Sequence, residues 1–225
     1  DPWRGKFYPP GLPRAERLTY YASRFPALEI NASFYRKPSL DSVRRWAAEV
    51  PETFRFALKA WQRITHQKRL RDCGQPLRLF AEAARALGGK LGPILYQLPP
   101  NLQKDLPLLR DFLAALPPDL RAAFEFRHDS WQDEEVHETL RAAGSALCVA
   151  ETDEGTMPLV RTAPFGYLRL RRAAYDARTL GRWAKRIAEA GFSEDVYVFF
   201  KHEDTAAGTE YAKRFVDLVA SPWLR

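Results

Sequence analysis

The sequence predicts an α/β protein built as a parallel β/α barrel. Short apolar runs of strand length alternate with amphipathic segments of helix length along its 225 residues, and this alternation is typical of βα units in a parallel sheet. Polar residues stand at the end of nearly every predicted strand, where β/α barrels form their active sites. No GxGxxG or GxxxxGK(S/T) turn follows a strand, which disfavours an open, doubly wound nucleotide-binding sheet.

Five segments carry hydrophobic residues at positions i, i+3, i+4 and i+7, which predicts helices with one buried face. They are residues 43–50, 80–87, 109–116, 180–187 and 212–219. Ser39 is the predicted N-cap of the first helix and Gly88 the predicted C-terminal cap of the second. Two weaker helices are expected over residues 14–24 and 133–143.

Seven apolar runs between these helices predict strands. They are residues 27–31, 54–59, 93–98, 122–127, 146–150, 166–171 and 196–201. A closed barrel of this type has one strand more and typically about 250 residues. The sequence therefore predicts a barrel whose first strand lies before Asp1 or is missing. The length suits one large core, so a single domain over residues 1–225 is expected.

Composition narrows the class of protein. The chain has 35 Lys and Arg against 28 Asp and Glu, and its formal net charge of +7 favours anionic partners weakly. It has no apolar stretch of about 18 residues and opens without a signal-peptide pattern, so no membrane association is expected. Cys73 and Cys148 are too few and too far apart for a disulfide framework, which predicts reduced thiols in a cytoplasmic protein. The oligomeric state is not specified by these features.

The polar residues at the strand ends form the candidate site. They are Glu29 and Asn31, Lys59, Gln97, Glu125 and Arg127, Arg169 and Arg171, and Lys201 with His202. Three of these pairs are spaced by two residues, so both members of each pair share one face of their strand. Because parallel strands of a barrel end at the same rim, we expect these side chains to converge there.

Single members of the set also have structural explanations. Glu125 and Arg127 could form no more than a structural ion pair at the rim. His66, in a predicted loop, could be a hydrogen-bonded loop histidine. Trp131 could cover the core or stack on a ring-shaped ligand, and the sequence does not separate the two. The coincidence of polar groups on most strand ends is what favours a functional site.

Cations outnumber acids at the strand ends. The cations are Lys59, Arg127, Arg169, Arg171 and Lys201, and the acids are Glu29 and Glu125. Such a set attracts a phosphate or carboxylate group, which arginines can bind bidentately. Glu125 or Glu29 is then a candidate general acid or base, with His66 as a second proton carrier. We expect an enzyme without a cofactor that acts on an anionic, phosphate-bearing substrate, with phosphodiester hydrolysis of nucleic acid as one form.

Two other functions are compatible with the sequence. A non-catalytic nucleic-acid or nucleotide binder would use the positive charge and rings such as Trp61 and Trp131, and would lose affinity steeply with salt. A metal-dependent phosphoesterase or nuclease would draw ligands from the acidic and histidine side chains of the set. Those candidates are Glu29, Glu125, His66, His128 and His202. No HExxH motif or close histidine pair supports a metal site, so none is expected.

Five segments resemble, in order along the chain, motifs of the YecE-like family, known as domain of unknown function 72. They are EINASFYRKPS (29–39), FRFALKAWQRITH (54–66), LGPILYQLPP (91–100), FEFRHDSW (124–131) and YVFFKHED (197–204). The resemblance implies a TIM-like β/α barrel. It implies no activity, because the family has none assigned. Combining the motif positions with the strand-end cations, we expect substrate-binding roles for Asn31, Tyr35, Lys59, Gln97, Arg127, His128, Trp131, Arg169, Arg171 and Lys201.

The chain departs from the family pattern in two places. The family usually opens with a strand reading Ile-Gly-Thr-Ser-Gly-Trp before a Trp-x-Gly-x-Phe-Tyr-Pro stretch, and only the latter is present, at residues 3–9. Without that strand the sheet has two open edges. Residues 169–175 read RLRRAAY where many members read Arg-Leu-His-Gly, so no histidine role can be carried to Arg171. The replacement makes the predicted site more basic.

Overall fold

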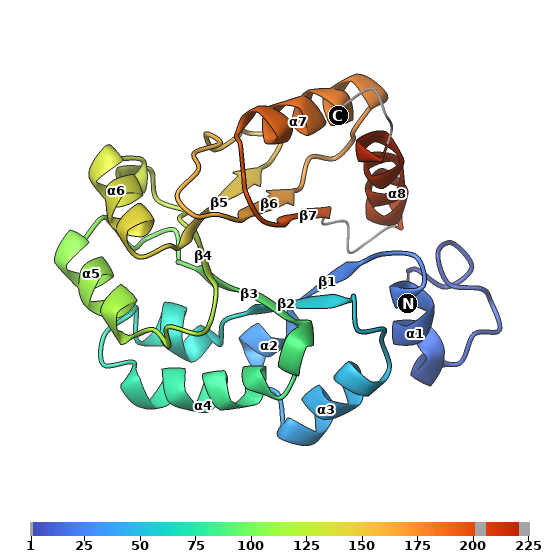
Figure 1. The fold of residues 1–225 in the computed structure, drawn as a ribbon, viewed down its shortest axis with the longest axis horizontal. Helices are drawn as coiled ribbons and strands as arrows, with labels where there is room; N and C mark the ends of the chain where they lie inside the picture. The colour runs from blue at the N-terminus through green and yellow to red at the C-terminus, as the bar shows by residue number, and fades with distance from the viewer. Residues whose placement is uncertain (1, 201–205, 221–225) are drawn as a thin grey trace.

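The computed structural model describes residues 2–200 and 206–220. Within them, seven parallel strands form one sheet in the sequential order β1 to β7. The sheet curls into a nearly closed barrel with helices between the strands (Figure 1). The predicted α/β barrel is confirmed.

All seven predicted strands are present, with shifted ends. They are β1 (Ala27–Ile30), β2 (Arg55–Lys59), β3 (Leu91–Gln97), β4 (Ala122–Glu125), β5 (Ala146–Glu151), β6 (Gly166–Leu170) and β7 (Val196–Phe200). Because β4 ends at Glu125 and β6 at Leu170, Arg127 and Arg171 lie just beyond the strands on which they were predicted. Lys201 and His202 fall outside the described residues.

The helices match the predicted faces, with additions. They are α1 (Arg17–Ala22), α2 (Ala32–Tyr35), α3 (Leu40–Ala48), α4 (Gly74–Arg85), α5 (Leu106–Ala115), α6 (Glu134–Ala142), α7 (Ala177–Glu189) and α8 (Ala207–Val219). Ser39 caps α3 by accepting a hydrogen bond from the Ser42 backbone N–H, as predicted. Helix α2 and a π-helical turn at Arg63–Gln67 were not predicted. None of the helices in the described ranges has the length and apolar character to cross a bilayer.

Alternating side chains divide the strands into two faces. The outward side chains pack under the helices and include Phe56, Leu58, Tyr96 and Phe124. The inward side chains fill the barrel as a separate cluster that includes Ala57, Leu95, Ala123, Cys148 and Tyr167. Two residues further along the same inward face stand Lys59, Gln97, Glu125 and Arg169. The apolar barrel interior therefore ends in a polar layer at the carboxyl ends of the strands.

The barrel has an opening between β1 and β7. Within the described residues these edge strands are not hydrogen-bonded to each other, and α1 and α8 lie beside the gap (Figure 1). Every residue of β1 is only half-buried, whereas β4 is buried throughout. A cavity of about 620 Å³ lies along this opening and is lined by residues of β1, β7 and α8.

Candidate functional site

A buried arginine on β6 joins two carboxylates from distant strands. Arg169 is 1% exposed; its Nη1 donates to Glu125 Oε2 at 2.7 Å and its Nη2 to Glu29 Oε1 at 2.8 Å. Asn31 Oδ1 lies 3.4 Å from the same Nη2, and the Tyr167 hydroxyl donates to Glu29 Oε2 at 2.7 Å. Because β1, β4 and β6 are not neighbours in the sheet, these contacts cross the barrel interior. Removing one partner would leave an unpaired buried charge, so the network holds its members in place.

Glu125 pairs with three guanidinium groups. Besides Arg169, its Oε1 accepts from Arg127 Nε at 3.0 Å and from Arg171 Nη2 at 3.4 Å. Burial by itself raises the pKa of Glu125, but the three guanidinium groups together outweigh burial and hold the pKa at about 2. Glu125 is therefore ionised at any physiological pH and is a poor proton carrier.

Donors without acceptors surround this carboxylate. The Nε atoms of Arg169 and Arg171 and the Nε2 of Gln97 are buried, with no hydrogen-bond acceptor in the described part of the chain. Gln97 is paired with Glu125 in the register of β3 and β4 and helps to lower its pKa, although its Nε2 does not reach hydrogen-bonding geometry. Burial and the neighbouring guanidinium groups lower the pKa of Arg171 more than Glu125 raises it. An added negative charge would therefore be stabilised here.

Lys59, at the end of β2, lies near the charged groups of Arg169, Glu125 and Glu29. Its Nζ lies 3.9 Å from the centroid of the Phe34 ring, and the His66 ring packs edge-on against the same ring, with centroids 4.8 Å apart. Burial and the charge of Arg169 lower the pKa of Lys59 to about 8, against the opposing effect of the nearby carboxylates. Burial and the charge of Lys59 lower the pKa of His66, which favours the neutral imidazole. The His66 Nδ1 is 2.9 Å from Thr65 Oγ1.

The charged and polar side chains at the carboxyl ends of the strands are together called the mouth of the barrel. They are Glu29, Lys59, Gln97, Glu125, Arg127, Arg169 and Arg171.

Two short helical turns place the rings beside the mouth. The Ser33 hydroxyl, in α2, lies 2.7 Å from the carbonyl oxygens of both Ile30 and Lys59. It therefore ties α2, and with it Phe34, to the end of β2. The π-helical turn that carries His66 follows β2 closely, and such turns are frequent at functional sites.

Comparison with known proteins places the chain in a family. A family model described as a protein of unknown function, DUF72, matches residues 1–223. The chain belongs to the DUF72 family. The UPF0759 protein YunF of Bacillus subtilis is 26% identical over 252 residues, which cover 94% of this chain and 89% of YunF. The UPF0759 protein YecE of Escherichia coli K12 is 33% identical over 112 residues, which cover 49% of this chain and 41% of YecE. The predicted family is confirmed, and neither name states an activity.

Solved structures of DUF72 proteins share the fold. One from Thermotoga maritima has a TM-score of 0.81 at 24% identity, covering 97% of this chain and 95% of that one. One from Enterococcus faecalis V583 has a TM-score of 0.77 at 19% identity, covering 91% and 93%. These likenesses support the TIM-like barrel, and at such identity they say nothing of the reaction.

Most of the site residues that the sequence predicts lie in the mouth or beside it. Those brought together are Glu29, Asn31, Lys59, His66, Gln97, Glu125, Arg127, Arg169 and Arg171. Tyr35 is 70% exposed and contacts Phe34. The His128 Nδ1 accepts from the Ser130 backbone N–H, so this ring caps a turn. Lys201 lies outside the described residues.

The substrate-binding prediction for Trp131 is corrected by the structure. The Trp131 ring is 1% exposed and stacks on Phe126 at a centroid distance of 4.6 Å. Its Nε1 donates to the Leu102 carbonyl oxygen at 2.7 Å. Because its only polar atom is satisfied inside the protein, Trp131 is a core residue.

Sequence reasoning missed two polar groups on the strands. Tyr167 belongs to the network, and its spacing of two residues from Arg169 on a predicted strand could have found it. Glu151 ends β5 and accepts hydrogen bonds from Tyr175 and Trp183 at 2.8 and 3.0 Å. These two partners come from the segment around α7, so Glu151 anchors the outer layer and lies apart from the mouth.

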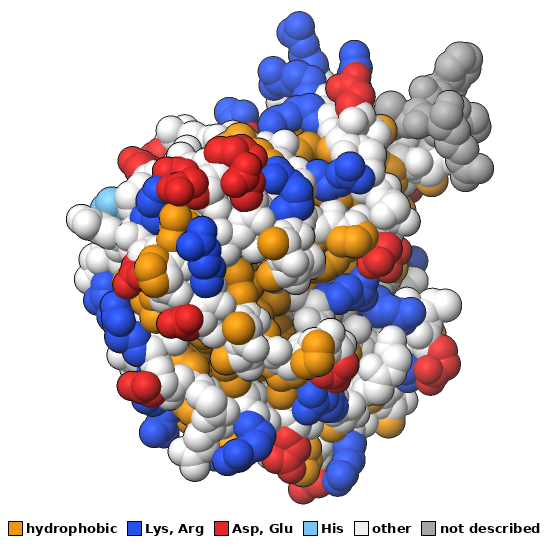
Figure 2. Space-filling model, turned by 60° about the vertical axis from the view of Figure 1, so that its left-hand side comes forward, with side chains coloured by type: hydrophobic (Ala, Val, Ile, Leu, Met, Phe, Trp, Pro, Cys, Tyr) orange, Lys and Arg blue, Asp and Glu red, His pale blue; other side chains and the backbone are white. Residues whose placement is uncertain are grey.

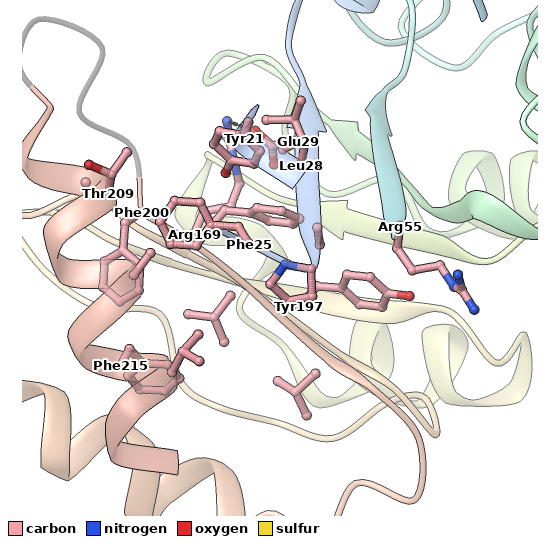
Figure 3. Close-up of a pocket in the computed structure, with 18 of the residues that line it drawn as sticks. Tyr21, Phe25, Leu28, Glu29, Arg55, Arg169, Tyr197, Phe200, Thr209 and Phe215 are labelled. Atoms are coloured by element: carbon pink, nitrogen blue, oxygen red, sulfur yellow. Dashed lines mark hydrogen bonds and ion pairs between the residues drawn. The ribbon is translucent and has the colours of Figure 1, made fainter. Parts of the chain in front are cut away.

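The cavity along the opening reaches the same network from the side. Its lining is mainly apolar and aromatic, with Phe25, Tyr197, Phe200 and Phe215 contributing rings (Figure 3). Glu29 and Arg169 are also part of this lining. The buried ion pairs are thus flanked by an apolar cavity on the β1–β7 side.

The metal-dependent alternative gains no ligand set from the structure. Across residues 2–200 and 206–220, no three or more His, Cys, Asp or Glu side chains are grouped to hold a metal ion. The carboxylate oxygens of Glu29 and Glu125 face guanidinium and hydroxyl donors. His202, one predicted ligand, lies outside the described residues.

Proposed function

We propose that this DUF72 protein is an enzyme that binds an anionic, phosphate-bearing substrate at the mouth of its barrel. The observation that carries this proposal is the set of buried donors on Arg169, Arg171 and Gln97 that find no acceptor in the part of the chain that the structure describes. A buried donor left unpaired costs about 1–3 kcal/mol, and an oxyanion supplies the missing acceptors. Four cationic side chains in the mouth meet two carboxylates, so positive charge remains after internal pairing.

The side chains divide into supporting and substrate-facing groups. Glu29 and Glu125 hold Arg169, which replaces the acid–base role first expected of these carboxylates. The side chains of Arg127 and Arg171 are 34% and 17% exposed, so they can pair with a phosphate bidentately. His66, with its lowered pKa, supplies a neutral imidazole that can take a proton from water. The reaction class we propose is phosphoester hydrolysis, with nucleic-acid phosphodiesters included.

Anion binding is tested with two neighbouring arginines. We expect inorganic phosphate at about ten times its Kd to stabilise the protein by about 1.4 kcal/mol in thermal unfolding. Arg171→Gln should abolish this gain because it removes a mouth guanidinium. Arg172→Gln should keep it, because Arg172 pairs with Asp153 at 3.8 Å. A phosphate effect of equal size in both variants would remove the mouth from the proposal.

Turnover is tested in the same preparations. Phosphate release from a panel of phosphomonoesters, and cleavage of labelled oligonucleotides, should depend on both Arg171 and His66. His66→Gln is compared with His137→Gln, because His137 pairs with Glu134 on α6. Activity that survives His66→Gln unchanged contradicts its assignment as the proton carrier.

Nucleic-acid binding without catalysis is a weaker proposal. Figure 2 shows acidic and basic side chains interspersed over one face rather than a basic patch. The burial of Trp131 removes one of the two rings expected to stack on bases.

We also propose a reducing, cytoplasmic location for the protein. The two described cysteines are buried and unpaired, which supports this location.

A further inference from the structure

The ammonium group of Lys59 is held in an unusual way. Within residues 2–200 and 206–220, its Nζ has no ion pair or hydrogen bond, and its close contact is the face of Phe34 at 3.9 Å. The carboxylates that influence it, Glu29 and Glu125, are already committed to Arg169 at 2.8 and 2.7 Å. Lys59 is therefore surrounded by charge without a counter-ion of its own among the described residues.

Lys90 shows how the same chain buries an ordinary ammonium group. The Lys90 Nζ donates to the carbonyl oxygens of Ala47 and Val50 at 2.7 and 2.8 Å, and Glu52 lies 3.0 Å away. Three acceptors thus stabilise the charged form of Lys90. Lys59 is instead buried beside guanidinium groups, which favours the neutral amine over the weaker attraction of the ring face for the ammonium cation.

The electrostatics make that amine available near neutral pH. Burial and Arg169 lower the pKa of Lys59 to about 8. At pH 7.5 roughly a quarter of such amines are neutral, against about one in a thousand for an ordinary lysine. A desolvated lysine beside another cation is a recurrent form of activated nucleophile.

We propose that Lys59 is a nucleophile that forms a Schiff base with the carbonyl carbon of an anionic carbonyl compound, such as a 2-oxo acid or an open-chain sugar phosphate. This assignment rests on the anion-binding part of the proposed function, because the mouth arginines would hold the negatively charged group. Among anionic substrates it selects those that carry a carbonyl beside that group, and it does not involve the phosphoester hydrolysis proposed above.

The proposed step needs no reactant beyond one proton from the solvent. The lone pair of the neutral Nζ forms a bond to the carbonyl carbon, and the carbonyl oxygen gains the proton that the nitrogen loses, which gives a carbinolamine. The hydroxyl group then takes one further proton from the solvent and leaves as water. The product is a protonated imine on Lys59. His66 contacts the same Phe34 ring as Lys59, and its neutral imidazole can carry the transferred proton.

Reductive trapping tests the proposal on the whole protein. Pyruvate and glycolaldehyde phosphate are the probes, each with cyanoborohydride, followed by intact mass measurement and peptide mapping. We expect one adduct at Lys59, formed at least about tenfold faster than at exposed lysines such as Lys185. The labelling rate should rise with pH through a midpoint near 8. Labelling of Lys59 no faster than of Lys185 would overturn the proposal.

Variants and a neutral probe separate this proposal from the anion site. The adduct should be absent from Lys59→Arg and present in Lys185→Arg. Peptide mapping of the unmodified protein locates the adduct even if a variant does not fold. If phosphate still stabilises the protein through Arg171 but no adduct forms, the Schiff base is wrong and the anion site stands. If propanal labels Lys59 as fast as the anionic probes and phosphate has no effect, the anionic substrate class is wrong.

Discussion

Glu125 illustrates how a buried charge is turned into a structural element. Its side chain is fully buried and faces guanidinium groups from β6 and from the two segments that follow β4 and β6. Burial alone would favour the protonated acid, and the paired arginines reverse that preference. The residue thus binds the ends of two strands together through charge, which makes its ionisation a determinant of stability.

The pH dependence of unfolding follows from this pairing. The folded-state pKa of Glu125 is about 2, below the ordinary value of 4.5. The stabilisation is therefore complete above about pH 4.5 and is lost as the pH falls toward 2. We expect Glu125→Gln to lower the free energy of unfolding at pH 7 by about 3–5 kcal/mol, and to weaken its decrease in acid, measured by urea titration from pH 7 to pH 3. Glu82→Gln, at an exposed site on α4, is the control. An unchanged acid profile in Glu125→Gln would contradict the pairing.

The sequence located these residues but not their partners. Strand-end position and period two were enough to place Glu29, Glu125 and Arg169 on inward faces at one rim. The contacts between them cross the barrel from strands that are not neighbours, and no local pattern encodes which guanidinium reaches which carboxylate. Trp131 shows that position after a strand does not by itself identify a binding residue. Its indole ring suits both a core and a ligand site until the partner of its Nε1 is known.

At the scale of elements, the turns after β1 and β2 carry as much of the site as the strands do. Helix α2 has four residues, and the π-helical turn with His66 has five. Segments this short cannot show a hydrophobic period, so the sequence predicted no helix at either place. The long amphipathic helices, in contrast, were found by their spacing alone. Hydrophobic spacing does not predict residues that are placed by packing against a strand end, such as Phe34.

Ser33 is the test of how α2 supports the site. Its hydroxyl is completely buried and lies 2.7 Å from two carbonyl oxygens, so Ser33→Ala leaves one or both without a donor. We expect a loss of about 1–3 kcal/mol in the free energy of unfolding. We also expect slower probe labelling of Lys59, because Phe34 is no longer held beneath its amine. Ser23→Ala is the control, since Ser23 is exposed and its hydroxyl donates within its own turn, to the Tyr20 carbonyl oxygen. Equal stability of the two variants would show that α2 does not depend on Ser33.

At the scale of the whole molecule, the sheet has a closed side and an open side. The sequence predicted parallel strands from their alternation with helices, and the order β1 to β7 follows from joining each neighbouring pair through a crossover. The two open edges expected of these seven strands correspond to the opening between β1 and β7 in the described residues. The width of that opening was not predictable, because it depends on tilt and stagger between strands rather than on any one of them. The half-buried residues of β1 and the apolar cavity beside β7 are the consequence.

The rate of backbone amide hydrogen exchange should therefore differ between the edge strands and the central strands of the barrel. In the described residues β1 pairs only with β2, and β7 only with β6, so each can detach without breaking a second ladder. Strands β3 and β4 are paired on both sides and almost wholly buried, so their amides open only with the core. We expect amides of β1 and β7 to exchange at least about tenfold faster than those of β3 and β4, with β5 and β6 between them. Native-state exchange followed by mass spectrometry measures this order. Amides of β1 that exchange as slowly as those of β3 would mean that the two edges hold each other as firmly as a continuous sheet does.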